Sequence, residues 1–330
     1  MHTAGGFPKS CMPETFRAIA PGRVNLIGDH TDYTGGLVFP MAIDRSTVIE
    51  FAESDAMSLV SADVEGDEWL RYVEAVHRLV SGSRSVSGRV STTIPIGAGL
   101  SSSAALEVAA ALALGFRGSA VELAQLCRQA EHDATGVPCG IMDQLCIAAG
   151  RAGHATLIDC RSLEVTYAPV PESVKVVVRF VASRTLEGSE YARRVAECAA
   201  AEAVVGPLRD VALRELAAID DARVRRRAVH VVSENARVRS FAGALSSYNF
   251  GLAGEIMLEG HRSLAENFEV STAEMDRAVR ELAETPGVYG ARMTGGGFGG
   301  CVVALCDPEA RVDGWVVAAS DGARVESLSA

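Results

Sequence analysis

The first 170 residues alternate between strand-like and helix-like runs of apolar and polar positions. Residues 17–28, 37–52 and 88–97 are rich in β-branched side chains and are bounded by glycine or proline, which is typical of strands. The third run passes through a glycine turn into an alanine-rich apolar stretch at 101–116, which has the length of a helix. This order predicts a domain in which strands and helices form two layers.

A second helix is predicted to begin at Ser119, because Ser119 and Glu122 have the spacing of a capping box. Its apolar residues form one stripe at helical spacing: Leu123, Leu126, Cys127 and Ala130. Glu131 lies four residues after Cys127 and therefore falls on the same inward-facing stripe. A carboxylate there needs a partner, either a salt bridge at the helix end or a metal ion.

The second half of the chain has a different pattern. A strand-like run at 174–182 is followed by an Arg- and Ala-rich helical region near 188–245 and by further helices to about residue 284. A glycine-rich run then leads into the apolar, strand-like segment 301–306. Pro169 and Pro171 mark the expected boundary between the halves. We therefore predict an α+β protein with domains at 1–170 and 171–330.

Composition and charge narrow the classes of function. Apolar residues make up 48% of the 330 residues and charged residues 22%, as in a globular protein. The net charge of −11 argues against nucleic acid or an anionic membrane as a partner. Residues 1–20 lack the pattern of a secretory signal, and the longest apolar region, 104–116, is too short to span a bilayer. We expect a cytoplasmic protein that binds neither nucleic acid nor membrane.

The eight cysteines are scattered and include no CxxC pair. This spacing gives no support to a zinc site or a thioredoxin-like site. We expect reduced thiols in a cytosolic core.

Residues 95–107 place glycines and serines at the junction between a strand and a helix. Glycines let the backbone approach a ligand, and the helix N-terminus offers unpaired N–H groups, so the junction suits a phosphate. It lacks the lysine of a Walker A loop. The alternative is a serine-capped helix after a tight turn.

Residues 294–300 contain a GxGxxG pattern, but an apolar strand follows where a Rossmann fold would have a helix. This loop suits close approach to a phosphate chain or another loop, and the alternative is an ordinary tight turn.

Asp143 follows Gly140 near the expected start of a helix, where it is either a functional carboxylate or a cap. Residues 22–36 contain more polar side chains than a turn needs.

Three motifs occur in order along the chain: GRVNLIGDHTDYTGG (22–36), PIGAGLSSSAALE (95–107) and GARMTGGGFGGC (290–301). With connecting segments such as GVPCGIMDQ (136–144), they resemble the galactokinases, within the GHMP family of small-molecule kinases. The resemblance runs from about residue 20 to 301. It implies a two-domain GHMP fold, with an N-terminal domain like part of ribosomal protein S5 and a ferredoxin-like C-terminal domain. ATP and a sugar would lie between the two domains.

The resemblance also implies roles for residues of the ATP side. The residues expected around the triphosphate are Pro95, Gly97, Gly99, Ser101, Ser102, Ser103, Gly295, Gly296 and Gly297. Ser103, or alternatively Ser102, would hold Mg²⁺ together with Glu131. Arg23 and Asp143 match the catalytic pair of the family. Asp143 would either accept the proton of the anomeric hydroxyl or mainly orient that hydroxyl, while Arg23 keeps it ionised.

On the sugar side, the resemblance implies that Asp32 accepts hydrogen bonds from the C3 and C4 hydroxyls. Asp29 and His30 would face the C6 end, and Gly140 and Tyr191 would complete the pocket. Galactokinases usually have glutamate where this chain has Asp29, which is one methylene shorter. The segment 179–191 is also shorter than the usual run of the family.

These two departures favour a galacto-configured sugar extended at C6, a heptose or octose such as the substrate of the lincosamide octose kinase, over galactose itself. A non-catalytic sugar and ATP sensor of the same fold is a further alternative, but the intact serine loop and Asp143 count against it. We expect a monomer or weak homodimer that binds only small molecules.

Overall fold

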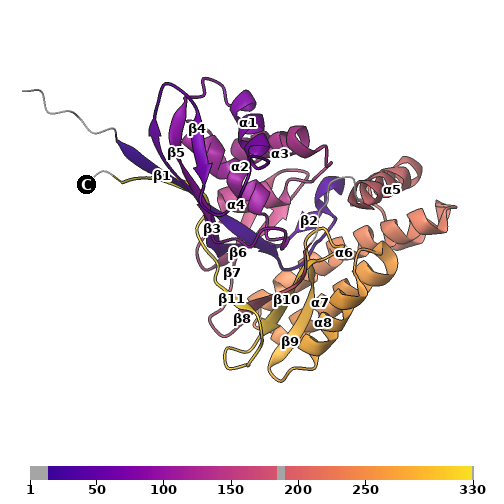
Figure 1. Ribbon diagram of the computed structural model, residues 1–330. Coiled ribbons are helices and arrows are strands. Elements are labelled where there is room, and N and C mark those ends of the chain that lie inside the picture. Colours follow the sequence, from indigo (N-terminus) through magenta and orange to yellow (C-terminus); the bar gives the residue numbers. More distant parts are fainter. Residues whose placement is uncertain (1–13, 184–189, 329–330) are drawn as a thin grey trace, which may run out of the picture.

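The computed structural model describes residues 14–183 and 190–328, and its first half is built on a five-stranded sheet (Figure 1). The strands run in the order β12-β1-β3-β5-β4. Their bounds are Thr15–Asn25 (β1), Pro40–Glu53 (β3), Ser58–Ser61 (β4), Val86–Thr92 (β5) and Arg324–Ser327 (β12). Only the β4–β5 pair is parallel among these strands. The sheet thus holds the two predicted strands β1 and β3 side by side at its centre.

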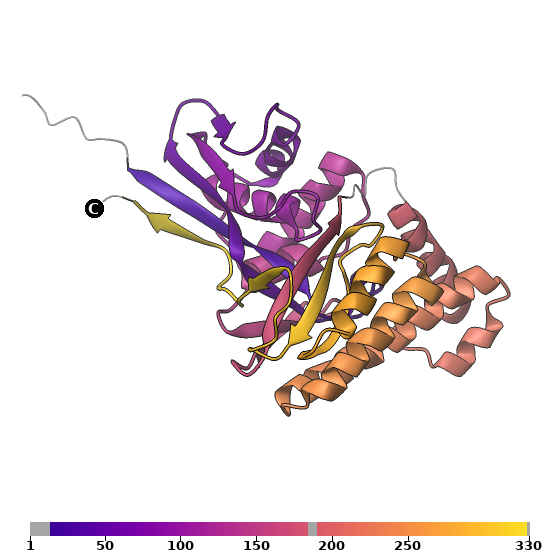
Figure 2. The same cartoon turned by 60° about the horizontal axis from the view of Figure 1, so that its bottom comes forward.

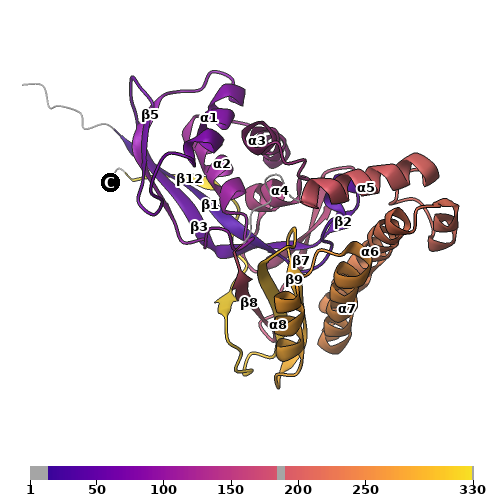
Figure 3. The ribbon, with the colours of Figure 1, turned by 45° about the vertical axis from the view of Figure 1, so that its right-hand side comes forward.

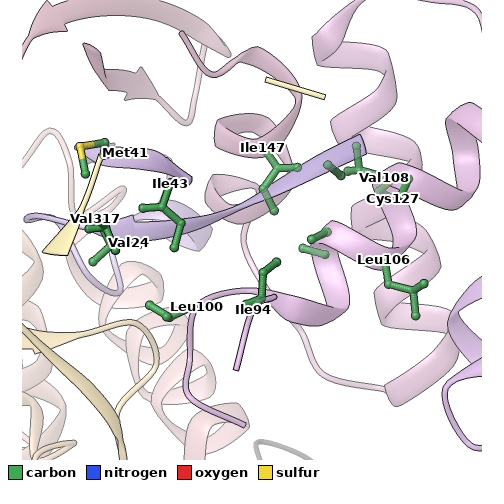
Figure 4. Close-up of a cluster of buried hydrophobic side chains, with 14 of the residues drawn as sticks. Val24, Met41, Ile43, Ile94, Leu100, Leu106, Val108, Cys127, Ile147 and Val317 are labelled. Carbon is green, nitrogen blue, oxygen red and sulfur yellow. The ribbon is translucent and has the colours of Figure 1, made fainter. Parts of the chain in front are cut away.

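Helices α2 (Ser102–Ala113) and α4 (Met142–Ala149) pack on this sheet, and α1 (Leu70–Leu79) and α3 (Ala120–Thr135) pack on α2. Helix α2 contacts β1 and β3 as well as the other three helices. It can lie at the centre because its residues are small and apolar almost all round. Figure 4 shows side chains of this core, including Val24 of β1 and Val108 of α2. The predicted capping box of Ser119 and Glu122 is confirmed at the start of α3.

The second half has a four-stranded antiparallel sheet of order β11-β8-β10-β9. The strands are Lys175–Ala182 (β8), Val288–Thr294 (β9), Gly300–Cys306 (β10) and Trp315–Val317 (β11). The helices of this half are Glu190–Val205 (α5), Ala222–Ser246 (α6), Phe250–Ser263 (α7) and Ala273–Ala283 (α8). Helices α7 and α8 contact β9, and α6 contacts α7 (Figure 2).

A small third sheet lies at the junction of the two halves. It contains β2 (Leu37–Val38), β6 (His154–Asp159) and β7 (Glu164–Pro169). Short helical turns lie at Asp32–Thr34 (η1), Leu213–Ala218 (η2) and Leu264–Phe268 (η3). Helix α6 contacts both β2 and β7, so the second half packs directly on this junction (Figure 3).

Two expectations about the second half need correction. The helical region expected near 188–245 is two helices, α5 and α6, because Gly206 takes a left-handed φ of 83° after α5 and Asp221 caps a new helix. Residues 171–330 do not all belong to the second sheet. Strand β12 pairs with β1 and closes an edge of the first sheet that would otherwise be unpaired.

No helix in residues 14–183 and 190–328 is long and apolar enough to cross a membrane. The seven cysteines within the same ranges are free thiols, and five of them are buried. The expectation of thiols in the core is therefore confirmed for those five, while Cys11 lies outside the described residues.

Candidate active site

A cavity of about 330 Å³ lies where the two halves meet. The predicted residues that line it are Arg23, Asp29, His30, Asp32, Gly97, Gly99, Ser101, Ser102, Ser103, Glu131, Gly140, Asp143, Tyr191, Gly295 and Gly296. Pro95 and Gly297 do not line it. Gly297 instead shapes the turn between β9 and β10: its φ is 78°, and a Cβ there would lie 2.5 Å from the carbonyl oxygen of Val270. Residues from five separate segments, 23–32, 97–103, 131–143, 191 and 295–296, thus meet around one space.

Arg23 and Asp143 form a bidentate ion pair inside this cavity. Arg23 Nε donates to Asp143 Oδ1 at 2.8 Å and Nη2 donates to Oδ2 at 2.7 Å. The remaining Nη1 donates to the carbonyl of Gly99 at 2.6 Å, which ties the pair to the serine loop. Burial opposes the charge of Arg23, but Asp143 outweighs it and the pKa of Arg23 is raised. The arginine therefore stays charged beside the carboxylate.

Ser101 also holds Asp143. It precedes α2 with a left-handed backbone, φ 63° and ψ 45°, and its hydroxyl donates to Asp143 Oδ2 at 2.5 Å instead of capping the helix. His30 and Phe298, in the other two motif loops, have φ values of 67° and 60°. A left-handed conformation is costly for residues other than glycine and is concentrated at functional sites.

Glu131 and Ser103 place oxygen atoms side by side at another wall of the cavity. Ser103 Oγ donates to Glu131 Oε1 at 2.9 Å, and Gln144 Nε2 donates to Oε2 at 2.6 Å. Burial, and next the charge of Asp143, raise the pKa of Glu131 to about 7. A carboxylate and a hydroxyl are hard ligands that suit Mg²⁺. Among the described residues no three His, Cys, Asp or Glu side chains gather as a metal site, so substrate oxygens or water would have to complete the coordination.

Gln144 and Glu107 were given no role by the sequence analysis. Gln144 Nε2 lies 3.4 Å from Glu107 Oε2 as well as close to Glu131, so it bridges two carboxyl groups. Burial, and next the charge of Glu131, raise the pKa of Glu107 well above its usual range. The signal was available, because Glu107 is the only charged residue of α2.

Asp32 and Gly140, which the resemblance assigns to the sugar side, lie in close contact. A Cβ at Gly140 would lie 1.9 Å from Asp32 Oδ2, so the carboxylate occupies space that only glycine leaves. Burial, and next the charge of Asp143, raise the pKa of Asp32 to about 7.

An aromatic cluster joins the first loop to α5. His30 Nδ1 lies 3.0 Å from the hydroxyl of Tyr33, and the His30 ring centroid is 5.4 Å from that of Tyr191 and 4.7 Å from that of Phe268. Tyr191, in the first turn of α5, is buried and faces the cavity from the second half. The preceding residues 184–189, which are six of the thirteen residues of the shortened segment 179–191, lie outside the described residues.

The contacts of Asp29 differ from the expectation that its carboxylate faces the C6 end of the sugar. It lines the cavity, but its side chain is only 1% exposed, and both carboxylate oxygens accept bonds from the protein. The N–H of Gly295 donates to Oδ1 at 2.8 Å and Arg292 Nη2 donates to Oδ2 at 2.8 Å. The sequence analysis gave Arg292 no role, because nothing local links two residues so far apart in the chain.

A second cavity of about 170 Å³ adjoins the first. Ile96, Ser102 and Ser103 line both cavities, and Trp69 and Tyr72 add aromatic side chains to the second. These two aromatic residues were also missed, although they lie only three positions apart at α1. An apolar, partly aromatic space beside the serine loop suits a planar heterocycle.

Three family models match consecutive parts of the chain. They are the galactokinase galactose-binding signature at residues 7–53, the GHMP kinases N terminal domain at 70–151 and the GHMP kinases C terminal at 241–314. The galactokinase of Homo sapiens is 40% identical over 327 residues, which cover 88% of this chain and 83% of the human protein. The galactokinase of Thermococcus kodakarensis is 40% identical over 314 residues, covering 88% and 89% of the two chains.

Solved structures give the same result. The Lactococcus lactis galactokinase complexed with galactose has a TM-score of 0.86 at 29% identity and covers 94% of this chain and 95% of its own. The L. major mevalonate kinase in complex with R-mevalonate has a TM-score of 0.67 at 16% identity, which shows the fold alone; the match covers 92% and 96% of the two chains.

The two-domain α+β fold and the domain models define a GHMP kinase, as predicted. At about 40% identity over most of both chains, this protein belongs to the galactokinase family. It is a sugar kinase, a phosphotransferase that acts on an alcohol group, in a family that uses ATP as the phosphate donor.

Proposed function

We propose that this enzyme transfers the γ-phosphoryl group of ATP to the anomeric hydroxyl of galactose or a closely related galacto-configured sugar. The observation that carries the proposal is the Arg23–Asp143 pair, which lies in one cavity with Asp32 and the serine loop. A carboxylate fixed by a guanidinium between a sugar pocket and a phosphate cradle is placed to act on the hydroxyl that attacks phosphorus.

Asp143 would orient the anomeric hydroxyl and accept its proton. Arg23 and Ser101 fix both oxygens of Asp143, so the carboxylate cannot turn away from the substrate. Phosphoryl transfer asks little of a base because its transition state is loose, so orientation would be the larger part of the contribution.

The serine loop would hold the triphosphate. The first N–H groups of α2 have no partner within the helix and carry partial positive charge, which favours phosphate oxygens. Arg71 lines the same cavity and would add a full positive charge. The second cavity, with Trp69 and Tyr72, would take the base.

Mg²⁺ would be held by Glu131 and Ser103. When bound, the ion would neutralise negative charge on the phosphates. These residues fit Mg²⁺ by the chemistry of their oxygen donors. Burial raises the pKa of Glu131 to about 7, so a bound cation would stabilise its charged form. Gln144 would keep that carboxylate oriented.

The sugar would lie against Asp32, His30, Gly140 and Tyr191. Asp32 can accept hydrogen bonds from two neighbouring hydroxyls, and a hydroxyl buried without a partner costs about 1–3 kcal/mol. Galactose is the first candidate, since the matching relatives are galactokinases. A sugar extended at C6 is the second, favoured by the withdrawal of the Asp29 carboxylate onto Arg292 and Gly295. Action in the cytoplasm as a monomer or weak homodimer stays a prediction from sequence.

Initial rates on galactose and on C6-extended heptoses and octoses, with ATP and Mg²⁺, test the proposal. Asp143→Ala should lower kcat by at least about 10³-fold while an ATP analogue still binds. Asp133→Ala, an exposed aspartate on α3, is the matched control and should retain full activity. Turnover of Asp143→Ala near the wild-type rate would refute the catalytic assignment. Binding of sugar and ATP by the wild-type protein without turnover would favour the sensor alternative.

A further inference from the structure

The carboxylate of Asp29 joins two segments that are 263 or more residues apart. Asp29 comes from the first motif loop, and its two partners, Arg292 and Gly295, come from β9 and the glycine loop that follows it. Each carboxylate oxygen accepts one hydrogen bond of 2.8 Å from these partners. The backbone carbonyl of Asp29 is a third contact, 3.1 Å from His230 Nε2 of α6.

Arg292 extends this contact into a buried ion network. Its Nη1 donates to Glu234 Oε1 at 2.8 Å, and the same oxygen accepts the N–H of Gly28 at 3.0 Å. Arg237 Nε donates to the other oxygen of Glu234 at 2.6 Å. Two carboxylates therefore face two guanidinium groups, and Arg292 and Glu234 are fully buried. Removing one member of such a buried ion pair leaves its partner charged and unpaired, which is strongly destabilising, so the pair holds together the segments that carry it.

A second, uncharged tie connects the same two loops. Thr294 Oγ1 accepts the N–H of Asn25 at 3.1 Å and donates to the carbonyl of Asn25 at 2.9 Å. The residues that follow, Gly295 and Gly296, line the cavity. The start of the glycine loop is thus fixed against the loop that carries Arg23 and Asp32.

We propose that Asp29 is a positioning residue that fixes the glycine loop 294–300 against the motif loop 22–36, so that the nucleotide and sugar sides of the cavity are held as one unit. This inference rests on the proposed function, in which the glycine loop covers the nucleotide. It differs from a role as ligand of the C6 hydroxyl, which would make Asp29 important for the sugar alone.

Asp29 and Asp32 provide a matched comparison three residues apart. The carboxylate of Asp29 is committed to donors from the second half, whereas that of Asp32 lies against Gly140 of the first half. Loss of charge at Asp29 therefore releases the glycine loop. Loss of charge at Asp32 affects only the sugar pocket.

The test is the binding of the non-hydrolysable analogue AMP-PNP with Mg²⁺, measured by titration calorimetry in the absence of sugar. Asp29→Asn should raise the Kd for AMP-PNP about tenfold or more. Asp32→Asn should leave that Kd within about twofold of wild type and weaken only the sugar, with galactose as the probe. A nucleotide Kd for Asp29→Asn that matches wild type, with only galactose binding reduced, would overturn the inference. Failure of the wild-type protein to bind AMP-PNP would instead contradict the proposed function.

Thr294→Val keeps the test informative if Asp29→Asn is poorly folded, which its thermal unfolding curve would reveal, and a double variant extends the test where Asp29→Asn folds. Thr294→Val removes the uncharged tie without leaving a buried charge, and it should raise the Kd for AMP-PNP about threefold. In the double variant Asp29→Asn/Arg292→Gln the two changes should not multiply, because both break the same contact. An unchanged Kd in Thr294→Val together with fully multiplicative effects in the double variant would also overturn the inference.

Discussion

Ser101 combines a strained backbone with a hydrogen bond to the proposed catalytic carboxylate. Its φ of 63° is one that glycine adopts readily, yet the position holds serine, whose hydroxyl reaches Asp143 at 2.5 Å. The bond restricts the carboxylate to the orientation that Arg23 also sets. Conformational strain at this residue is thus coupled to the geometry of the reaction site.

Replacing Ser101 separates the two effects. Ser101→Ala and Ser101→Gly both lose the hydroxyl, so both should lower kcat by about tenfold or more with little change in the Kd for ATP. Only Ser101→Gly relieves the left-handed strain, so it should be more stable than Ser101→Ala by about 1 kcal/mol. Steady-state kinetics and urea unfolding measure these quantities. Equal stability of the two variants, or unaltered kcat in both, would contradict this account.

At the scale of single residues, the sequence indicates which residues belong to the candidate site, but it says less about which of them contact one another. Motif loops are local, so the family resemblance assigned Arg23, Asp32 and the serine loop to one site, and these residues line one cavity. The contact of Asp29 with Arg292 and the bond of Ser101 to Asp143 depend on how distant loops meet. Nothing in the local sequence determines such a meeting, which is why Asp29 was expected to face the sugar.

At the scale of elements, the turn before α4 decides where Asp32 can lie. Gly140 precedes the helix by two residues, and the carboxylate of Asp32 fills the space where a side chain would be. The apolar stripe and the capping box predicted α3 because both are local features, and Gly140 indicated the start of α4, where Asp143 pairs with Arg23 and does not cap the helix. Periodicity did not predict the break between α5 and α6, where high alanine and arginine content continues the helical signal beyond Val205.

Gly140→Ala should displace Asp32 and weaken the sugar without affecting the nucleotide. The added Cβ would lie 1.9 Å from Asp32 Oδ2, far inside van der Waals contact, so the carboxylate must move. We expect KM for the sugar to rise about tenfold or more and the Kd for AMP-PNP to stay unchanged. Gly243→Ala on α6 is the control: no atom lies within 4 Å of the added Cβ, so this variant should keep wild-type kinetics. An unaltered sugar KM in Gly140→Ala would argue against the placement of Asp32.

At the scale of the molecule, the two halves are interleaved more than a simple boundary suggests. Strand β12 returns to pair with β1, and the helix α6 reaches the junction sheet through β2 and β7. Composition and family resemblance predicted the two-domain fold, but the return of the last strand is a pairing between the two ends of the chain. A local pattern carries no information about such a pairing.

Several acidic side chains have shifted pKa values in the folded protein, so the free energy of unfolding depends on pH. The pKa of Asp32 and that of Glu131 are raised to about 7 by burial, against about 4 in an unfolded chain. Between about pH 4 and pH 7 these two carboxyl groups therefore hold more protons in the folded protein than in the unfolded chain, and their contribution to the free energy of unfolding should fall as the pH rises through this range. Burial lowers the pKa of His230 and of His261 to about 4, so these histidines act in the opposite sense up to about pH 6.5. Asp159 also acts in the opposite sense, since its bond with Arg209 lowers its pKa and its stabilisation is lost only in acid, below about pH 4.

Above about pH 6.5 the carboxyl groups outweigh the histidines, so the unliganded protein should have a higher Tm at pH 6.5 than at pH 8, measured by calorimetry at constant ionic strength. Asp32→Asn removes a carboxylate that ionises at a cost, so it should flatten this dependence and stabilise the protein by about 1–2 kcal/mol at pH 8. Asp133→Asn, an exposed change on α3, should leave the wild-type slope intact. If Asp32→Asn kept that slope as well, the protonation of Asp32 would not be what links folding to pH. Because the same carboxylate would accept the sugar hydroxyls, the affinity of wild type for galactose should rise across the pH range in which its unliganded stability falls.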